Sequence, residues 1–165
     1  LALKKLRYNS MYFGVAVFSK DRAGDHFAFN IPHKEIIFHR LTRLNFLGED
    51  KPKDKVGFLF EITFREDMPI AKASDSEIRS AVIEGLERME FAAEKDLLGF
   101  ELRKVEHSYV IYDLEHRRNT DTVLNYLRSL GIESCGRFAE HEYLNMDHVI
   151  ERAMRLCERL NVEWR

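Results

Sequence analysis

Hydrophobic residues alternate with polar ones along several stretches of the chain, a pattern typical of strands that bury one face. The clearest case is residues 56–64, where the alternating apolar residues are Phe58, Phe60, Ile62 and Phe64. Residues 100–112 predict a second long strand, and residues 10–19, rich in Tyr, Phe and Val, predict one mostly buried on both faces. Shorter strands are expected at residues 27–30 and 35–41, and a charged loop at residues 48–55. Short connections between consecutive strands favour antiparallel pairing.

Three stretches predict helices. The clearest spans residues 74–89, where Ser74 and Glu77 form a capping box. An apolar stripe follows at helical spacing, and it consists of Ile78, Ala81, Val82, Leu86 and Met89. A second helix is expected to be capped by Asn119 or Thr120 and to stop at Gly131, and a short strand to follow at residues 132–135. The third helix is expected from about Asp147, with a stripe of Val149, Ile150, Ala153, Met154, Cys157 and Leu160. These elements predict an α+β fold, an antiparallel sheet with helices on one face.

Composition narrows the classes of function. The chain has 165 residues, is 45% hydrophobic and carries 26 basic against 28 acidic residues, a net charge of −2. Such a balance offers no field of one sign to hold nucleic acid, and no apolar run is long enough to span a membrane. Cys135 and Cys157 lack metal-ligand spacing and are expected to be packed thiols in a reducing cytoplasm, and the histidines give no support for metal catalysis.

Residues 136–148 form the strongest candidate for a ligand site, because they join the last predicted strand directly to the last helix. Gly136 allows the backbone to approach a ligand closely, and Arg137 offers a planar fork of donors for a phosphate or carboxylate. Asn145, Met146 and Asp147 then open a helix whose first amides lack partners within the helix. Those amides and the positive end of the helix dipole favour an anionic or electron-rich ligand.

This segment resembles the carboxy-terminal flavin motif of UDP-galactopyranose mutases and of protoporphyrinogen-oxidase-like amine oxidoreductases. The matching residues are Gly136, Arg137, Tyr143, Asn145, Met146 and Asp147. Weaker matches lie upstream, at Phe38-His39-Arg40 and at Val110-Ile111-Tyr112-Asp113. The chain departs from the motif at Ala139, which replaces a glycine, and at Ala153, where relatives often have a helix glycine.

The resemblance implies an FAD cofactor in the full-length protein. It assigns cofactor binding to the six motif residues and to His148, with the amides of Met146, Asp147 and His148 facing the N1–C2=O2 edge of the flavin. It also implies that Tyr109, Tyr112 and Asp113 approach the same end of the sheet as the motif, where Tyr112 could line a cavity for a small-molecule substrate or simply pack. Arg40 is assigned to the same substrate. No catalytic residue is assigned.

Each of these roles has a structural alternative. Tyr143 could anchor the core, and Asn145 and Asp147 could act as helix caps only. Arg40 needs a counter-charge, which could be a substrate anion or Glu61 on a neighbouring strand. The basic residues His116, Arg117 and Arg118 precede the second predicted helix and are expected to be solvated.

The sequence contains no Gly-x-Gly-x-x-Gly, the turn that binds the FAD pyrophosphate in these families. We therefore expect a fragment of a longer enzyme: a substrate-binding α+β domain at residues 1–132 and a returning flavin segment at residues 133–165. By itself the chain is expected to lack flavin, to be inactive and to self-associate. Two alternatives are a fragment of a UDP-galactopyranose-mutase-like flavoenzyme, and a cofactor-free protein-interaction domain.

Overall fold

In a computed structural model of the chain, residues 1–47 and 54–160 are described, so most of the predicted charged loop lies outside the described residues. The strands are β1 (Tyr8–Phe18), β2 (Ala28–Asn30), β3 (Arg40–Arg43), β4 (Val56–Phe64) and β5 (Leu97–Val110). The α-helices are α1 (Asp75–Arg88), α2 (His116–Ser129) and α3 (Met146–Arg159). Short 3₁₀ helices are η1 (Ala2–Lys5), η2 (Leu44–Phe46), η3 (Pro69–Lys72) and η4 (Glu94–Asp96).

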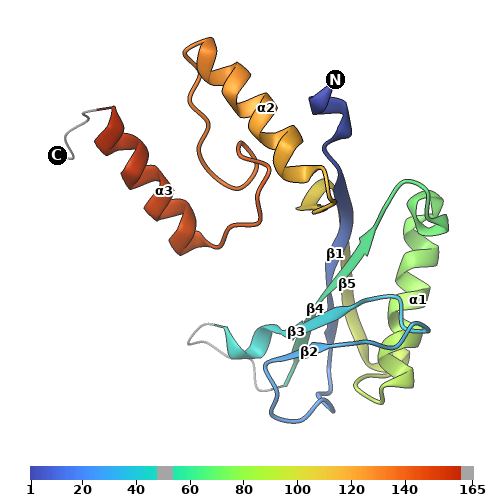
Figure 1. Ribbon diagram of the computed structural model, residues 1–165. Coiled ribbons are helices and arrows are strands. Elements are labelled where there is room, and N and C mark those ends of the chain that lie inside the picture. Colours follow the sequence, from blue (N-terminus) through green and yellow to red (C-terminus); the bar gives the residue numbers. More distant parts are fainter. Residues whose placement is uncertain (48–53, 161–165) are drawn as a thin grey trace. The chain divides into compact units, whose positions relative to one another are not determined.

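The strands form one sheet in the order β2-β3-β4-β1-β5 (Figure 1). β4 is antiparallel to both neighbours, with Phe60 opposite Gly14 of β1 and Leu41 of β3. β5 also runs antiparallel to β1, since Ser19 donates its N–H to the Asp96 carbonyl at one end and the Ser10 hydroxyl donates to the Glu106 carbonyl further along. The α+β fold class is therefore confirmed, and the predicted strand at residues 56–64 coincides with β4.

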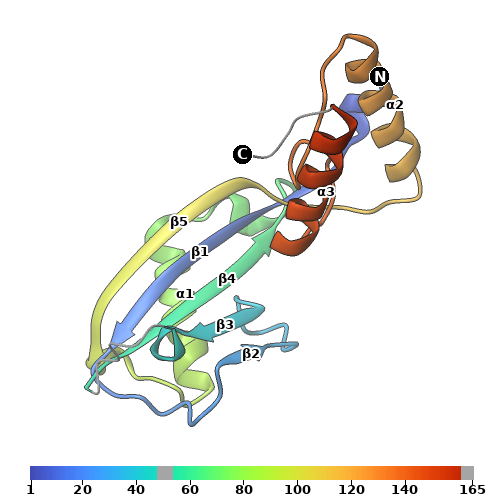
Figure 2. The ribbon, with the colours of Figure 1, turned by 90° about the vertical axis from the view of Figure 1, so that its left-hand side faces the viewer.

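Residues Asn9–Ser108 form one compact unit, here called the sheet unit, whose core lies between the sheet and α1. In Figures 1 and 2, α1 lies along one face of the sheet. The side chains of Phe58, Phe60, Phe64, Ile78 and Leu86 are fully buried there. Alternation along β4 and 3.6-residue periodicity along α1 bring these apolar faces together.

The amino terminus of α1 has the predicted capping box. Ser74 Oγ accepts from the Glu77 N–H at 3.3 Å, and Glu77 Oε2 accepts from the Ser74 N–H at 2.7 Å. The Ser74 hydroxyl also donates to Glu77 Oε2, at 2.7 Å. Because the hydroxyl and the N–H of Ser74 both donate to the carboxylate of Glu77, they stabilise its charged form, and the pKa of that group lies below its ordinary value.

The second compact unit, here called the terminal unit, consists of Leu1–Tyr8 and the chain from Tyr109 onward. It contains η1, α2 and α3, and the Lys5 ammonium lies 3.1 Å from Glu115 Oε2, just before α2. α2 buries His116, Asn119 and Thr120, whereas α3 buries none of its residues. These two compact units are structural, and they do not test the predicted division between a substrate-binding domain at residues 1–132 and a flavin segment at residues 133–165.

One strand prediction is confirmed and another was wrong in detail. β1 is mostly buried on both faces, as predicted: it buries alternate residues, including Tyr12, Ala16 and Phe18, and those between are partly buried. Residues 35–39 are not a strand; a β-carbon on Gly85 of α1 would lie 2.8 Å from Phe38, which shows how closely Phe38 packs on that helix. Pairing with β4 begins only at Arg40.

The predictions for the second helix and the strand after it also need correction. α2 begins at His116, because the Asp113 carboxylate accepts from the Glu115 N–H and the Asp113 carbonyl from the His116 N–H. Asn119 and Thr120 are therefore inside the helix, and Thr120 Oγ1 donates to the His116 carbonyl at 2.8 Å. Gly131 does end the helix, with φ of +75°. Residues 132–135 form no strand, as no sheet neighbour pairs with them in the described chain.

Candidate functional site

The segment from Gly136 begins with a tight turn in the terminal unit. The Gly136 N–H donates to Glu140 Oε1 at 2.9 Å, and the Gly136 carbonyl accepts from the Glu140 N–H at 2.9 Å. Gly136 has φ of +99°, which L-residues with a side chain rarely adopt. A β-carbon there would meet only Val149, at 3.8 Å, so the backbone conformation rather than crowding requires a glycine. Arg152 of α3 forms an ion pair with Glu140 and holds the turn against the helix.

Arg137 lies against an aromatic surface. Its guanidinium carbon is 4.6 Å from the centre of the Tyr143 ring and 4.8 Å from that of Tyr109. The two tyrosine rings are stacked, with their centres 5.8 Å apart. Cation–π attraction holds the guanidinium against these rings, which reduces the entropy lost when it binds an anion. The proximity of Tyr109 to the motif, expected from the resemblance, is present.

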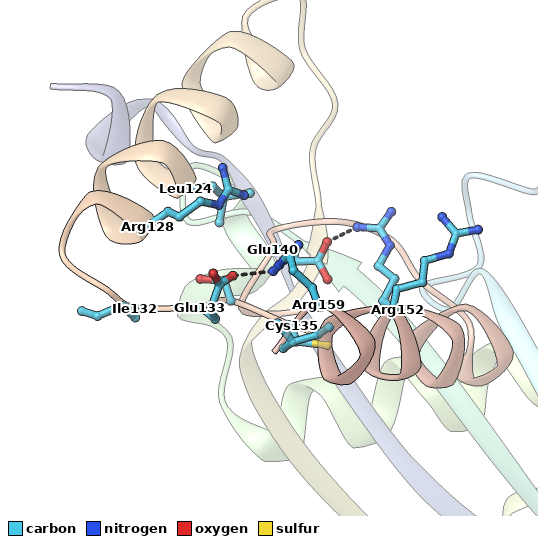
Figure 3. Close-up of a pocket in the computed structure, with 11 residues that line it drawn as sticks. Leu124, Arg128, Ile132, Glu133, Cys135, Glu140, Arg152 and Arg159 are labelled. Carbon is cyan, nitrogen blue, oxygen red and sulfur yellow. Dashed lines mark hydrogen bonds and ion pairs between the residues drawn. The ribbon is translucent and has the colours of Figure 1, made fainter. Parts of the chain in front are cut away.

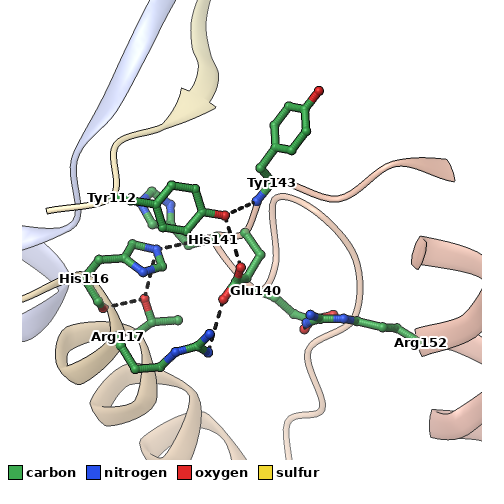
Figure 4. Close-up of polar contacts among 9 residues, drawn as sticks. Tyr112, His116, Arg117, Glu140, His141, Tyr143 and Arg152 are labelled. Carbon is green, nitrogen blue, oxygen red and sulfur yellow. Dashed lines mark hydrogen bonds and ion pairs between the residues drawn. The ribbon is translucent and has the colours of Figure 1, made fainter. Parts of the chain in front are cut away.

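Tyr112 connects the end of β5 to the same segment (Figure 4). Its hydroxyl accepts from the Tyr143 N–H at 2.6 Å and donates to Glu142 Oε2 at 3.1 Å. The other oxygen of Glu142 lies 3.2 Å from the guanidinium of Arg117 in an ion-pair contact, but it has no hydrogen-bond partner. The side chain of Arg117 is 72% exposed, so the expectation that it is solvated is confirmed, and the ion-pair contact lies at the surface. Through these contacts Tyr112 supports the motif, while its role toward a substrate stays a prediction.

His116, which was also expected to be solvated, is buried and 5% exposed. Its Nε2 lies 2.9 Å from the carbonyl of His141, so Nε2 carries the proton and donates (Figure 4). The ring of His116 also contacts the Tyr112 ring, with centres 4.5 Å apart. His141 has φ of +50°, and its Nε2 lies 3.1 Å from the Arg7 carbonyl. The first turn of α2 therefore supports the motif through the hydrogen bond from His116 to His141.

The amino terminus of α3 is exposed. Asn145 is the N-cap by position, with extended backbone, but its side chain makes no capping hydrogen bond, in contrast to Ser74 of α1. Met146 is 85% exposed, and Asp147 and His148 are also exposed. Helix geometry leaves the amides of Met146, Asp147 and His148 without acceptors inside the helix. This end of α3 can therefore accept an electron-rich group.

Arg40 is the one predicted site residue in the sheet unit. It stands directly opposite Glu61 in the β3–β4 register, and its Nε lies 3.8 Å from Glu61 Oε1. The structural alternative for Arg40 is thus present, although the pair is half-exposed. The role of Arg40 toward a substrate stays a prediction.

The remaining predicted residues come together in the terminal unit. The turn at Gly136, the supported guanidinium of Arg137, the half-exposed ring of Tyr143 and the uncapped start of α3 follow one another within thirteen residues of chain. This combination is suited to binding a planar, electron-rich group. Among residues 1–47 and 54–160, no group of three or more potential ligands is placed to hold a metal ion.

Sequence reasoning missed the residues that support this segment: Glu140, His141, Glu142, His116 and Arg117. One signal was available, because Glu140 follows Gly136 by four residues, the spacing at which a turn can return its side chain to the glycine amide. The burial of His116 had no local signal, since it depends on a contact with His141, twenty-five residues away.

Comparison with known proteins gives similarity at the level of the fold. No protein-family model and no curated protein matches the sequence. A solved structure of reduced UDP-galactopyranose mutase aligns with a TM-score of 0.79 and 17% identity, over 98% of this chain and 35% of that chain. A protein from Exiguobacterium sp. 255-15 assigned as a protoporphyrinogen oxidase aligns with a TM-score of 0.75 and 14% identity, over 98% of this chain and 36% of the other. The chain thus spans about a third of the length of these two neighbours.

Proposed function

We propose that the chain is the substrate-binding part, with the returning flavin segment, of an FAD-dependent oxidoreductase similar to the protoporphyrinogen-oxidase and amine-oxidase group. The observation that carries the proposal is the folded motif: Gly136, Arg137 and Tyr143 lead into the uncapped start of α3. The fold that this motif belongs to is shared with two proteins named as a UDP-galactopyranose mutase and a protoporphyrinogen oxidase. A small-molecule substrate and association with a second copy are part of the same proposal.

The residues of the motif and of the first turn of α3 have the donors and the charge needed to bind a flavin. The first amides of α3, from Met146 to His148, would donate toward the electron-rich edge of the ring, with Asn145 and Asp147 flanking them. Arg137 would hold an anionic part of the cofactor or substrate, supported by Tyr143 and Tyr109. When bound, the cofactor would supply hydride acceptance, and the residues of this chain would position it and stabilise negative charge.

The proposed compartment is the cytoplasm. Cys135 and Cys157 are free, half-buried thiols, which suits a reducing environment. As a separate finding, none of the helices in the described part of the chain is both long and apolar enough to cross a bilayer.

The test uses the protein encoded by the complete gene, purified with its flavin. Arg137→Ala should weaken binding of the cofactor or of an anionic substrate by roughly 1.5–3 kcal/mol, the range for a lost charge-assisted hydrogen bond. Folding should change little, because Arg137 is only half-buried. Affinity is measured by flavin fluorescence and stability by thermal unfolding.

The matched control is Arg103→Ala, since Arg103 is an exposed arginine of β5 paired with Glu101 in the sheet unit. It should leave cofactor affinity unchanged. A purified protein without any flavin, and unable to take it up, would favour the cofactor-free interaction domain. A fall in melting temperature for Arg137→Ala with unchanged affinity would make Arg137 a purely structural residue.

A second candidate is a flavoenzyme fragment similar to UDP-galactopyranose mutase, favoured by the structural match and by an arginine supported on two tyrosines. Arginines suit the binding of a diphosphate. In this case UDP should compete with the substrate of the full-length protein, and Arg137→Ala should weaken that competition. An FAD-dependent oxidase of amines or porphyrinogens should be indifferent to UDP.

A further inference from the structure

A cavity of about 300 Å³ lies in the terminal unit, beside the candidate flavin residues but not lined by any of them. Its walls come from the end of α2, from residues 132–135 and from the second half of α3 (Figure 3). Four arginines line it, namely Arg128, Arg152, Arg155 and Arg159. The three on α3 are spaced three and four residues apart, which puts them on one side of that helix.

The carboxylates in the wall do not balance these charges. Only Glu133 and Glu140 line the cavity, and each is already engaged by one arginine. Arg159 Nη2 lies 2.6 Å from Glu133 Oε2, and Arg152 pairs with Glu140. Two lining arginines therefore remain without an acidic partner in the wall.

Those two arginines are Arg128 and Arg155. Arg128 donates to the neutral amide oxygen of Asn125 at 2.9 Å, so its positive charge is not compensated by that bond. Arg155 pairs with Glu151, which lies one helical turn away on α3. Glu151 is exposed and does not line the cavity. Exposed pairs of this kind contribute little energy and exchange readily for a better anion.

The rest of the wall is partly apolar, with Leu124, Ile132 and Leu156 beside the arginines. The volume of the cavity is in the range of small-ligand sites, although its lining is more polar than that of most such sites. The guanidinium fork matches the geometry of both carboxylate and phosphate oxygens. The complementary ligand is therefore small, anionic at one end and apolar at the other.

We propose that this cavity binds a small organic oxyanion, a carboxylate or a phosphate monoester with an apolar body, through Arg128 and Arg155. The proposal does not depend on flavin binding, because none of the residues assigned to the cofactor lines the cavity. The two regions meet at Glu140, which accepts from the Gly136 amide with one oxygen and pairs with Arg152 through the other.

The experiment titrates the 165-residue chain with three probes of similar size, phenyl phosphate, benzoate and the neutral benzyl alcohol, by isothermal titration calorimetry. We expect saturable binding of at least one anion, with one site per chain, and none of the alcohol. Tighter binding of phenyl phosphate than of benzoate would identify a site for phosphate monoesters. Tighter binding of benzoate would identify a site for carboxylates. Absence of saturable binding by both anions would overturn the proposal.

The variants locate the site. Arg128→Gln and Arg155→Gln should each raise the Kd about tenfold or more, as expected for a lost charge-assisted hydrogen bond. Arg103→Gln, an exposed arginine in the sheet unit, should leave the Kd unchanged. Both cavity arginines are exposed at the surface of their helices, so circular dichroism should show an unchanged fold. Equal losses in all three variants, or unchanged affinity in the two cavity variants, would show non-specific charge attraction and overturn the proposal.

Discussion

Glycines at two positions are required for different reasons. Gly14 in β1 faces β5 so closely that a β-carbon would lie 2.0 Å from the Glu101 carbonyl oxygen and 2.7 Å from the Phe60 ring. Gly136 in the candidate site has open space around it but a positive φ. The first glycine lets two strands and a core phenylalanine meet, whereas the second gives the motif turn its shape.

Gly14→Ala should destabilise the sheet unit by about 1–3 kcal/mol or more, because the backbone of β5 has to move to admit the methyl group. Gly99→Ala in β5 is the matched control, since a β-carbon there meets nothing within 4 Å. Urea unfolding of both variants measures the difference. Equal stability of the two alanine variants would mean that β1 and β5 do not approach each other as described.

The two helix amino termini of α1 and α3 differ in how their first amides are satisfied. α1 begins with a complete capping box at Ser74, and α3 begins after Asn145 with no side-chain cap. The capping box satisfies the first amides of α1 and so stabilises a helix that packs on the sheet. The uncapped start of α3 leaves donors for a ligand, which is the element-level basis of the proposed flavin site.

Ser74→Ala should destabilise the chain by about 1 kcal/mol at neutral pH, the usual effect of losing an N-cap. The effect should shrink in acid. The pKa of Glu77 is lowered in the folded state by its hydrogen bonds with Ser74, so its contribution is present above the ordinary pKa and is lost as the pH falls through the lowered folded pKa. Urea unfolding at neutral and at acidic pH measures this, and a difference that grows in acid would contradict the described capping box.

Burial is distributed unevenly over the molecule. The sheet unit holds nearly all fully buried large side chains, including Phe18, Phe38 and Phe58. In the terminal unit α3 buries none of its residues, and Ile150 is 61% and Met154 49% exposed. The apolar stripe predicted for this helix therefore exists in the sequence but is largely uncovered in the described structure.

We expect the isolated chain to self-associate at micromolar concentration through this stripe, because exposed apolar patches bind one another in water. Ile150→Glu should lower the average mass measured by light scattering. Leu98→Glu serves as the control, since Leu98 is similarly exposed, at 55%, but lies in β5. A monomer at all concentrations, or an equal response to both substitutions, would exclude α3 as the association surface.

Several parts of the site could be anticipated from the sequence. Gly136, Arg137, Tyr143 and the start of α3 lie close in the chain, so their spacing alone placed them together. The family resemblance placed Tyr109 and Tyr112 at the same end of the sheet as the motif, but their contacts with Tyr143, more than thirty residues away, are seen only in the structure. The buried support from His116 and Glu142 had no sequence signal.

Elements with a local pattern could be predicted from the amino-acid sequence. Alternation over residues 56–64 predicted β4, and the capping box at Ser74 predicted the start of α1, since both depend on neighbours in the chain. Other features depend on tertiary contacts: residues 132–135 lack a pairing partner in the described chain, Arg40 lies opposite Glu61, and four arginines of α2 and α3 line one cavity. Strand pairing, ion pairs and cavities arise from contacts between residues far apart in the chain, and hydrophobic periodicity carries no information about which distant residues will meet.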